Sequence, residues 1–149
     1  MLRLSKKIDY GLMAMGYIAF LDKERVVNTR EIAEEYNIPV ELLAKILQKL
    51  AKKGLIVSQN GPKGGYLLAR EPMDITLGEF VKAIDGPIQM MECHQEGEHR
   101  CLQIEKCSVR SPLTKIQESI AGLLDNITLE EMRRDEIGHL TLHGEGVKG

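Results

Sequence analysis

Apolar residues recur at three- and four-residue steps near the start of the chain and predict two helices. The first covers residues 5–23, with Ser5 as its N-cap, and is apolar on two sides, which is typical of a helix buried on two sides. The second is short and runs from Thr29, a suitable N-cap, to Tyr36.

A third helix is predicted from Pro39 to about Lys53, because proline fits the first position of a helix and Gly54 can end one. Its apolar positions fall on one face. They are Leu43, Ile46, Leu47 and Leu50. The opposite, polar face carries Glu41, Lys45, Gln48 and Lys52.

Two short strands follow the third helix, at residues 55–59 and 66–69, and they flank the glycine- and proline-rich turn 60–65. Two helices joined by a tight turn and followed by a hairpin make a winged helix-turn-helix. We therefore expect a mainly α fold with a small β-hairpin.

The second half of the chain predicts a helix over residues 77–84, capped by Thr76, and a long helix that Ser111 and Pro112 begin. Apolar residues of the long helix form a stripe that suits packing against another helix, in the same chain or in a partner. They are Leu113, Ile116, Ile120, Leu123, Leu124 and Ile127. The expected domains are a winged helix-turn-helix at 1–86, a cysteine loop at 87–110, a dimerisation helix with a short following helix at 111–137, and a flexible tail at 138–149.

Charge is distributed unevenly along this chain of net charge −2. Residues 39–70 carry six basic residues against Glu41 alone, a local net charge of +5, whereas residues 71–149 carry eight basic and fifteen acidic residues. A basic patch on an otherwise acidic protein is what phosphate binding requires, although a solvated helix face can have the same composition.

Other classes of protein fit the sequence less well. The longest uncharged run, at residues 10–21, is too short for a bilayer span, and the opening residues lack the apolar region of a signal peptide, so we expect a cytoplasmic protein. The chain shows no nucleophile–base pair and no phosphate-binding loop, so we do not expect an enzyme.

The three cysteines are Cys93, Cys101 and Cys107, all within the loop at 87–110. An odd number in a chain without an export signal disfavours disulfides, and thiolates are ligands for soft metals and iron–sulfur centres. Structural zinc usually has closer cysteine pairs, so the wider spacing favours an iron–sulfur cluster over zinc. Metal-free redox thiols are the third alternative.

The chain resembles the winged-helix iron–sulfur transcriptional regulators of the IscR and NsrR type (the Rrf family), including regulators of SUF cluster-assembly operons. The resemblance covers about residues 1–136. It rests on the cysteine triad together with MLRLS at residues 1–5, DYG at 9–11, IAE at 32–34, KGLI at 53–56, GPKGGYLL at 61–68 and ITL at 75–77.

The resemblance implies a homodimer whose DNA binding changes with a cluster, 2Fe–2S or 4Fe–4S, held by the three cysteines. IscR-like proteins add a histidine three residues after the last cysteine, where this chain has Arg110. NsrR-like proteins add an aspartate from the first helix of the other subunit, which matches Asp9. Asp9 also lies among apolar neighbours, where a buried carboxylate is costly unless it is bound. His94 and His99 are the alternative ligands, and helix-dipole stabilisation is the alternative role for Asp9.

We expect the third helix to enter the major groove of a pseudo-palindromic operator, with Lys45 and Gln48 at base edges. Phosphate contacts are expected from Lys49, Lys52 and Lys63. Two positions depart from IscR-like proteins, because Asn60 replaces an arginine of the wing and Ala44 replaces a glutamate of the recognition helix. A winged helix that binds a protein partner, with zinc in the loop, is the rival interpretation.

Overall fold

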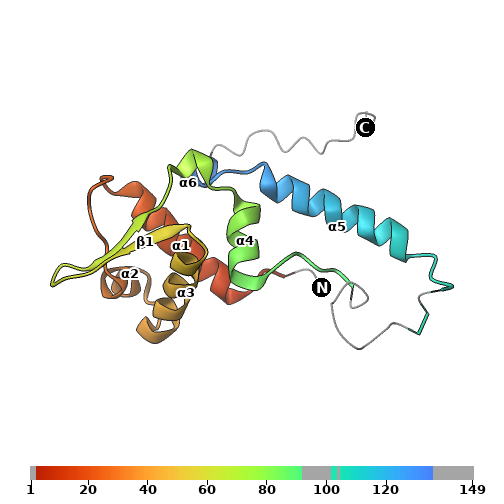
Figure 1. Cartoon of the computed structure of the whole chain (residues 1–149), viewed down its shortest axis with the longest axis horizontal. Coiled ribbons are helices and arrows are strands. Elements are labelled where there is room, and N and C mark those ends of the chain that lie inside the picture. The colour runs from red at the N-terminus through yellow and green to blue at the C-terminus, as the bar shows by residue number, and fades with distance from the viewer. Residues whose placement is uncertain (1–2, 92–101, 104, 136–149) are drawn as a thin grey trace.

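The computed structural model describes residues 3–91, 102–103 and 105–135. Its elements are α1 (Lys6–Phe20), α2 (Thr29–Tyr36), α3 (Val40–Lys52), β1 (Ile56–Gln59), β2 (Gly65–Leu68), the 3-10 turn η1 (Pro72–Asp74), α4 (Leu77–Asp85), α5 (Arg110–Asp125) and α6 (Leu129–Arg134). The β1–β2 hairpin, the wing, projects from one end of the molecule, and α5 projects from the other (Figure 1). This arrangement confirms the predicted winged helix-turn-helix with a long additional helix. Within the described residues, no helix combines the length and apolar composition needed to cross a membrane.

Two of the predicted helix caps are confirmed, and α6 has a cap of its own. The side chains of Ser5 and Thr76 accept backbone hydrogen bonds at the starts of α1 and α4. Thr128 and Glu131 form a reciprocal capping box at the start of α6. These caps satisfy backbone N–H groups that have no partner within the helix.

Two other predicted caps are wrong. Asn28 caps α2, with its Oδ1 accepting from the backbone N–H of Glu31 at 2.8 Å, so that Thr29 is already helical. Ser111 is no cap either, because α5 begins at Arg110 without a side-chain hydrogen bond at its N-cap. A proline is tolerated in the first turn of α5, where its missing N–H would have had no helical partner.

The hydrophobic core lies between α1, α3 and α4, with contributions from α2, β1 and α6. The predicted inner face of α3 is confirmed, since Leu43, Leu47 and Leu50 are 0% exposed and Ile46 is 3% exposed. Burial of this face fixes α3 on the body, and its polar face is therefore left in solvent.

The wing is fixed at its base by a third segment of chain. β1 and β2 pair in antiparallel register from Ile56–Leu68 to Gln59–Gly65. Val27, in the segment between α1 and α2, exchanges two backbone hydrogen bonds with Tyr66, at 3.0 and 2.7 Å. A Cβ atom at Gly65 would collide with the carbonyl of Val27, so the close approach requires glycine there.

Helix α5 has no buried residue within this chain. Its C-terminal part packs on α4, and Leu124 contacts the core. Further towards its N-terminus, Leu113 and Ile120 are half-buried, and Ile116 is 47% exposed. Since these residues lie on one side of the helix, α5 carries an apolar face that the protomer covers incompletely.

Candidate nucleic-acid interface and cysteine segment

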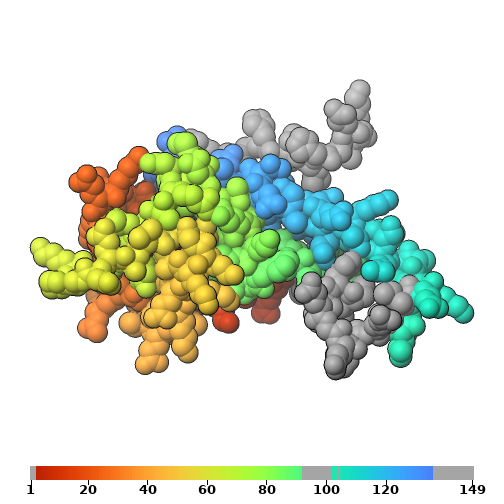
Figure 2. Space-filling model, in the orientation of Figure 1, coloured from red at the N-terminus to blue at the C-terminus, as the bar shows by residue number. Residues whose placement is uncertain are grey.

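The helix-turn-helix presents α3 to solvent at the end of the molecule that also carries the wing. The turn is tight, because Asn37 adopts a left-handed conformation (φ 52°) and its N–H bonds to the carbonyl of Ala33. In Figure 2, the yellow atoms of α3 and the wing lie away from the blue and teal atoms of α5. In this motif the second helix is the one that enters the major groove, and here it is α3.

The structure exposes most of the residues predicted to contact DNA. Ala44 is half-buried. The exposed ones are Glu41, Lys45, Gln48, Lys49, Lys52, Asn60 and Lys63. The polar face of α3 and the turn of the wing therefore both reach solvent, as a helix and wing that bind one duplex must.

Two exposed basic residues of the helix-turn-helix lie outside the predicted set of DNA contacts. Arg30 lies in the first turn of α2, and Lys53 is the C-cap of α3. The first helix of this motif crosses the DNA backbone, so a basic residue at its start is a signal that could have been used. Lys53 belongs to the basic patch at residues 39–70, but no DNA contact was predicted for it.

Lys49 departs from the expected arrangement. Its Nζ donates a hydrogen bond of 2.6 Å to the backbone carbonyl of Ile84, in the last turn of α4. The ammonium is thus engaged with the protein, although phosphate contact was predicted for it. The acceptor lies 35 residues further along the chain, and no local sequence pattern points to it.

The cysteine segment joins α4 to the N-terminal end of α5. Cys107 is half-buried, has a free thiol, and precedes α5 by three residues. Cys93, Cys101, His94 and His99 lie outside the described residues. Within the described part, no three metal-ligating side chains come together, so the predicted ligand set is not tested there.

Asp9 lies in the first turn of α1 and is half-exposed. It lines a shallow surface pocket together with Arg3 and Lys6. Asp9 is therefore not a buried carboxylate within this chain, contrary to the prediction, because this turn of α1 reaches the surface. The position suits both a helix-dipole role and a ligand role towards a second chain.

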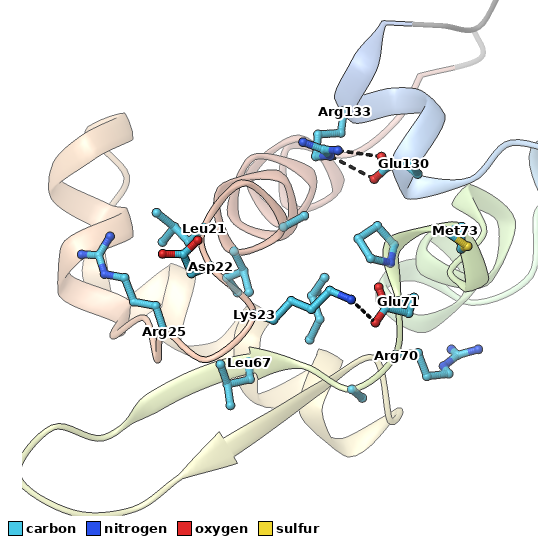
Figure 3. A pocket seen from close by; sticks show the side chains of 15 residues that line it. Leu21, Asp22, Lys23, Arg25, Leu67, Arg70, Glu71, Met73, Glu130 and Arg133 are labelled. Carbon is cyan, nitrogen blue, oxygen red and sulfur yellow. Dashed lines mark hydrogen bonds and ion pairs between the residues drawn. The ribbon is translucent and has the colours of Figure 1, made fainter.

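One pocket among the described residues lies away from the predicted interface. It has a volume of about 670 Å³ and is bounded by the end of α1, β2, η1 and α6 (Figure 3). Two ion pairs lie in its wall, with Lys23 Nζ 2.7 Å from Glu71 and Arg133 Nη2 2.6 Å from Glu130. The hydrogen bond from Arg133 lowers the pKa of Glu130. Its lining contains no serine, threonine, cysteine or histidine, so it offers none of these nucleophiles.

Comparison with known proteins gives one consistent result. The family model described as "Iron-dependent Transcriptional regulator", Rrf2, matches residues 4–135. The chain is 32% identical to the HTH-type transcriptional regulator IscR of Serratia proteamaculans over 131 residues, 88% of this chain and 79% of that one. It is 28% identical to the regulator NsrR of Oceanobacillus iheyensis, over 96% of this chain and 97% of that one.

A solved structure agrees with these relatives. The chain is similar to CymR, the global cysteine regulator of B. subtilis, with a TM-score of 0.72 and 30% identity, over 91% of this chain and 98% of that one. The resemblance found in the sequence is thus confirmed, and the function is DNA-binding regulation rather than catalysis. The chain belongs to the Rrf2 family of transcriptional regulators.

Proposed function

We propose that the protein is a homodimeric regulator whose operator binding is controlled by an iron–sulfur cluster. The observation that carries the proposal is the position of the cysteine segment, which connects α4 of the DNA-binding body to α5, the helix with an incompletely covered apolar face. A ligand held by this segment can change how the two parts sit relative to each other. Such a coupling of two sites is what a ligand-controlled regulator needs.

The donor set fits an iron–sulfur cluster. Three thiols within one short segment are ligands that soft metals and iron prefer, and Cys107 is a free thiol at the start of α5. When bound, the cluster supplies a centre that responds to redox state and to cluster supply. Cys93, Cys101 and Cys107 would hold it, in the 2Fe–2S or the 4Fe–4S form.

Asp9 of the partner subunit is the proposed fourth ligand. Within one protomer, α1 is part of the DNA-binding body, whereas Cys107 adjoins the end of α5 that projects furthest from it (Figure 1). This separation favours a ligand pair in which Asp9 and Cys107 come from different chains. That arrangement would connect the cysteine segment of one subunit to the DNA-binding body of the other.

DNA contacts follow from the exposed face of α3 and the wing. Lys45 and Gln48 reach base edges in the major groove, while Lys52 and Lys63 contact phosphates. Two-fold symmetry places two α3 helices about one turn of DNA apart on a pseudo-palindromic operator. Loss of the cluster would release α1 and change the spacing of the two α3 helices. The regulated genes are those of iron–sulfur cluster assembly or of a related stress response, in the cytoplasm.

A thiol-redox regulator is the second candidate. It is favoured by the similarity to a structure named as a global cysteine regulator and by the free, half-buried thiol of Cys107. In a thiol-redox regulator, or in one with structural zinc, the same cysteine segment would control DNA binding without inorganic sulfide. Metal analysis separates the two candidates directly.

Protein purified without oxygen is expected to contain iron and acid-labile sulfide in equal amounts and to absorb broadly in the visible range. The DNA probe is a selected duplex of about 30 base pairs, isolated by the wild-type protein from a random-sequence pool, which accommodates two half-sites. Cys107→Ala should lose the sulfide and bind this duplex with an affinity different from that of the loaded wild type, measured by gel shift.

The matched control for this variant is Ser108→Ala, which changes the exposed neighbour of Cys107 and should keep both cluster and affinity. Zinc without sulfide in the wild type would contradict the proposal. So would a Cys107→Ala protein that binds the selected duplex as tightly as the loaded wild type does.

Mixing two inactive variants tests whether Asp9 acts on the other subunit. Asp9→Ala and Cys107→Ala homodimers should each fail to hold a stable cluster. A mixed dimer still contains one site with an intact cysteine set and an intact partner aspartate, so we expect one cluster per mixed dimer after anaerobic reconstitution. Iron and sulfide per tagged, purified mixed dimer are the measurement. No cluster in the mixed dimer would place the fourth ligand within a single chain or elsewhere.

A further inference from the structure

Lys49 is the one residue of the predicted DNA interface that bonds to another helix among the hydrogen bonds described. Its Nζ donates to the carbonyl of Ile84 at 2.6 Å, in a partly buried contact. The neighbouring basic side chain of Lys52 is exposed on the same last turn of α3. Lys49 is exposed as well, so the two lysines differ in this hydrogen bond and not in overall exposure.

The acceptor is a carbonyl at the end of a helix. α4 ends at Asp85, so the carbonyl of Ile84 has no N–H partner further along the helix, whereas the N–H of Gly86 bonds to the carbonyl of Lys82. A cation there also interacts favourably with the negative end of the helix dipole. Lys49 therefore stabilises the last turn of α4 in two ways. It donates a hydrogen bond to the carbonyl of Ile84, and its positive charge interacts with the negative end of the helix dipole.

The same turn of α4 is packed closely against two other helices. A Cβ atom at Gly11 of α1 would lie 2.7 Å from Phe80 Cζ, 3.2 Å from Ile84 Cδ1 and 3.3 Å from Ile46 Cγ2. Glycine is thus needed where α1, α3 and α4 meet, because contacts this short leave no room for a methyl group. The last turns of α4 therefore pack tightly against α1 and α3.

From these contacts we infer that Lys49 is a positioning residue, which ties the C-terminal turn of α3 to the C-terminal turn of α4. It sets the orientation of the DNA-reading face and does not contact phosphate. The residues that follow α4 enter the cysteine segment, so the tie also links that segment to α3. This last clause rests on the proposed function, whereas the tie itself does not.

Three variants test the tie. Lys49→Met keeps the length of the side chain and removes the donor, Lys49→Arg keeps a donor and the charge, and Lys52→Met removes an equal charge from the same turn. The first measurement is the salt dependence of binding to a random-sequence duplex. Lys52→Met should reduce the slope by about 1 for each bound protomer, and Lys49→Met should leave it unchanged.

The second measurement is local stability, followed by amide hydrogen exchange. Lys49→Met should speed the exchange of the Gly86 amide, which closes the last turn of α4, by about three- to tenfold, and Lys49→Arg should restore it. Affinity for the selected duplex should fall by a similar factor in Lys49→Met and recover in Lys49→Arg. Lys52→Met should not change the exchange of Gly86.

Either of two results would overturn the inference. One is a loss of salt slope in Lys49→Met equal to that in Lys52→Met, which would make Lys49 a phosphate contact. The other is wild-type exchange at Gly86 in Lys49→Met. These comparisons are made in cluster-free protein, so they stand whether or not the wild type binds a cluster. A further comparison is the affinity of cluster-loaded protein for the selected duplex, divided by that of cluster-free protein. This ratio should move towards 1 in Lys49→Met. A ratio of 1 in the wild type would instead mean that the proposed function is wrong.

Discussion

Replacing Ile120 by glutamate is expected to convert the proposed dimer into monomers and to lower affinity for the selected duplex by at least about 100-fold. Ile120 lies on the apolar face of α5 that its own protomer leaves half-covered. A second copy of α5 is the partner in the proposed dimer. A carboxylate placed in that contact would be buried without a partner, at a cost of several kcal/mol.

The loss of DNA affinity follows from the loss of one of two linked half-site contacts. A dimer binds its second half-site at a high effective concentration, and a monomer loses this advantage. Sedimentation equilibrium and gel shift on the same preparations measure the two effects. The variant should keep its helical circular dichroism, since Ile120 lies outside the buried core of the protomer.

Ser119→Glu is the matched control for Ile120→Glu. It adds the same charge one residue earlier, about 100° around the helix, at an exposed position. It should remain dimeric and bind the selected duplex like the wild type. A dimeric Ile120→Glu protein would place the subunit contact on another surface.

Substitutions at two adjacent positions of α3 should affect different properties. One should lower the free energy of unfolding, and the other should lower affinity for DNA. Leu47 is 0% exposed, so Leu47→Ala removes buried methyl groups and leaves a cavity. The expected loss of unfolding free energy is about 2–5 kcal/mol. For a domain whose total stability is about 5–15 kcal/mol, that is a large fraction, and urea denaturation measures it.

Gln48→Ala should change stability by less than about 0.5 kcal/mol, because Gln48 is exposed. It should lower affinity for the selected duplex by about 1–3 kcal/mol and leave binding to a random-sequence duplex unchanged, because a base contact specifies sequence. An equal loss on both duplexes would mean that Gln48 contacts the phosphate backbone.

The fold of α3 was predictable because its two faces differ in composition. The structure buries the predicted apolar face, which is Leu43, Ile46, Leu47 and Leu50, and exposes the polar residues opposite it. Helix starts were less predictable. Asn28 and Thr29 are both suitable cap residues. The structure uses Asn28, which directly follows Val27, the residue hydrogen-bonded to Tyr66.

The candidate site was predictable only in part. Exposure of Lys45, Gln48 and Lys63 follows from the helical period and from the turn. The bond of Lys49 to Ile84 depends on how α3 packs against α4, which local periodicity does not contain. The cluster ligands stay a prediction, since Cys93 and Cys101 lie outside the described residues.

The backbone pairing of Val27 with Tyr66 also determines where the chain tolerates changes in length during evolution. Val27 fixes the base of the wing, and the next residue, Asn28, caps α2. An insertion between them would break one of these two contacts. Residues 22–25 form an exposed turn, and only the bond from the Arg25 N–H to the Asp22 carbonyl closes it among the backbone bonds described there. Related chains should therefore differ in length at this turn and stay uniform from Val27 onwards into α2.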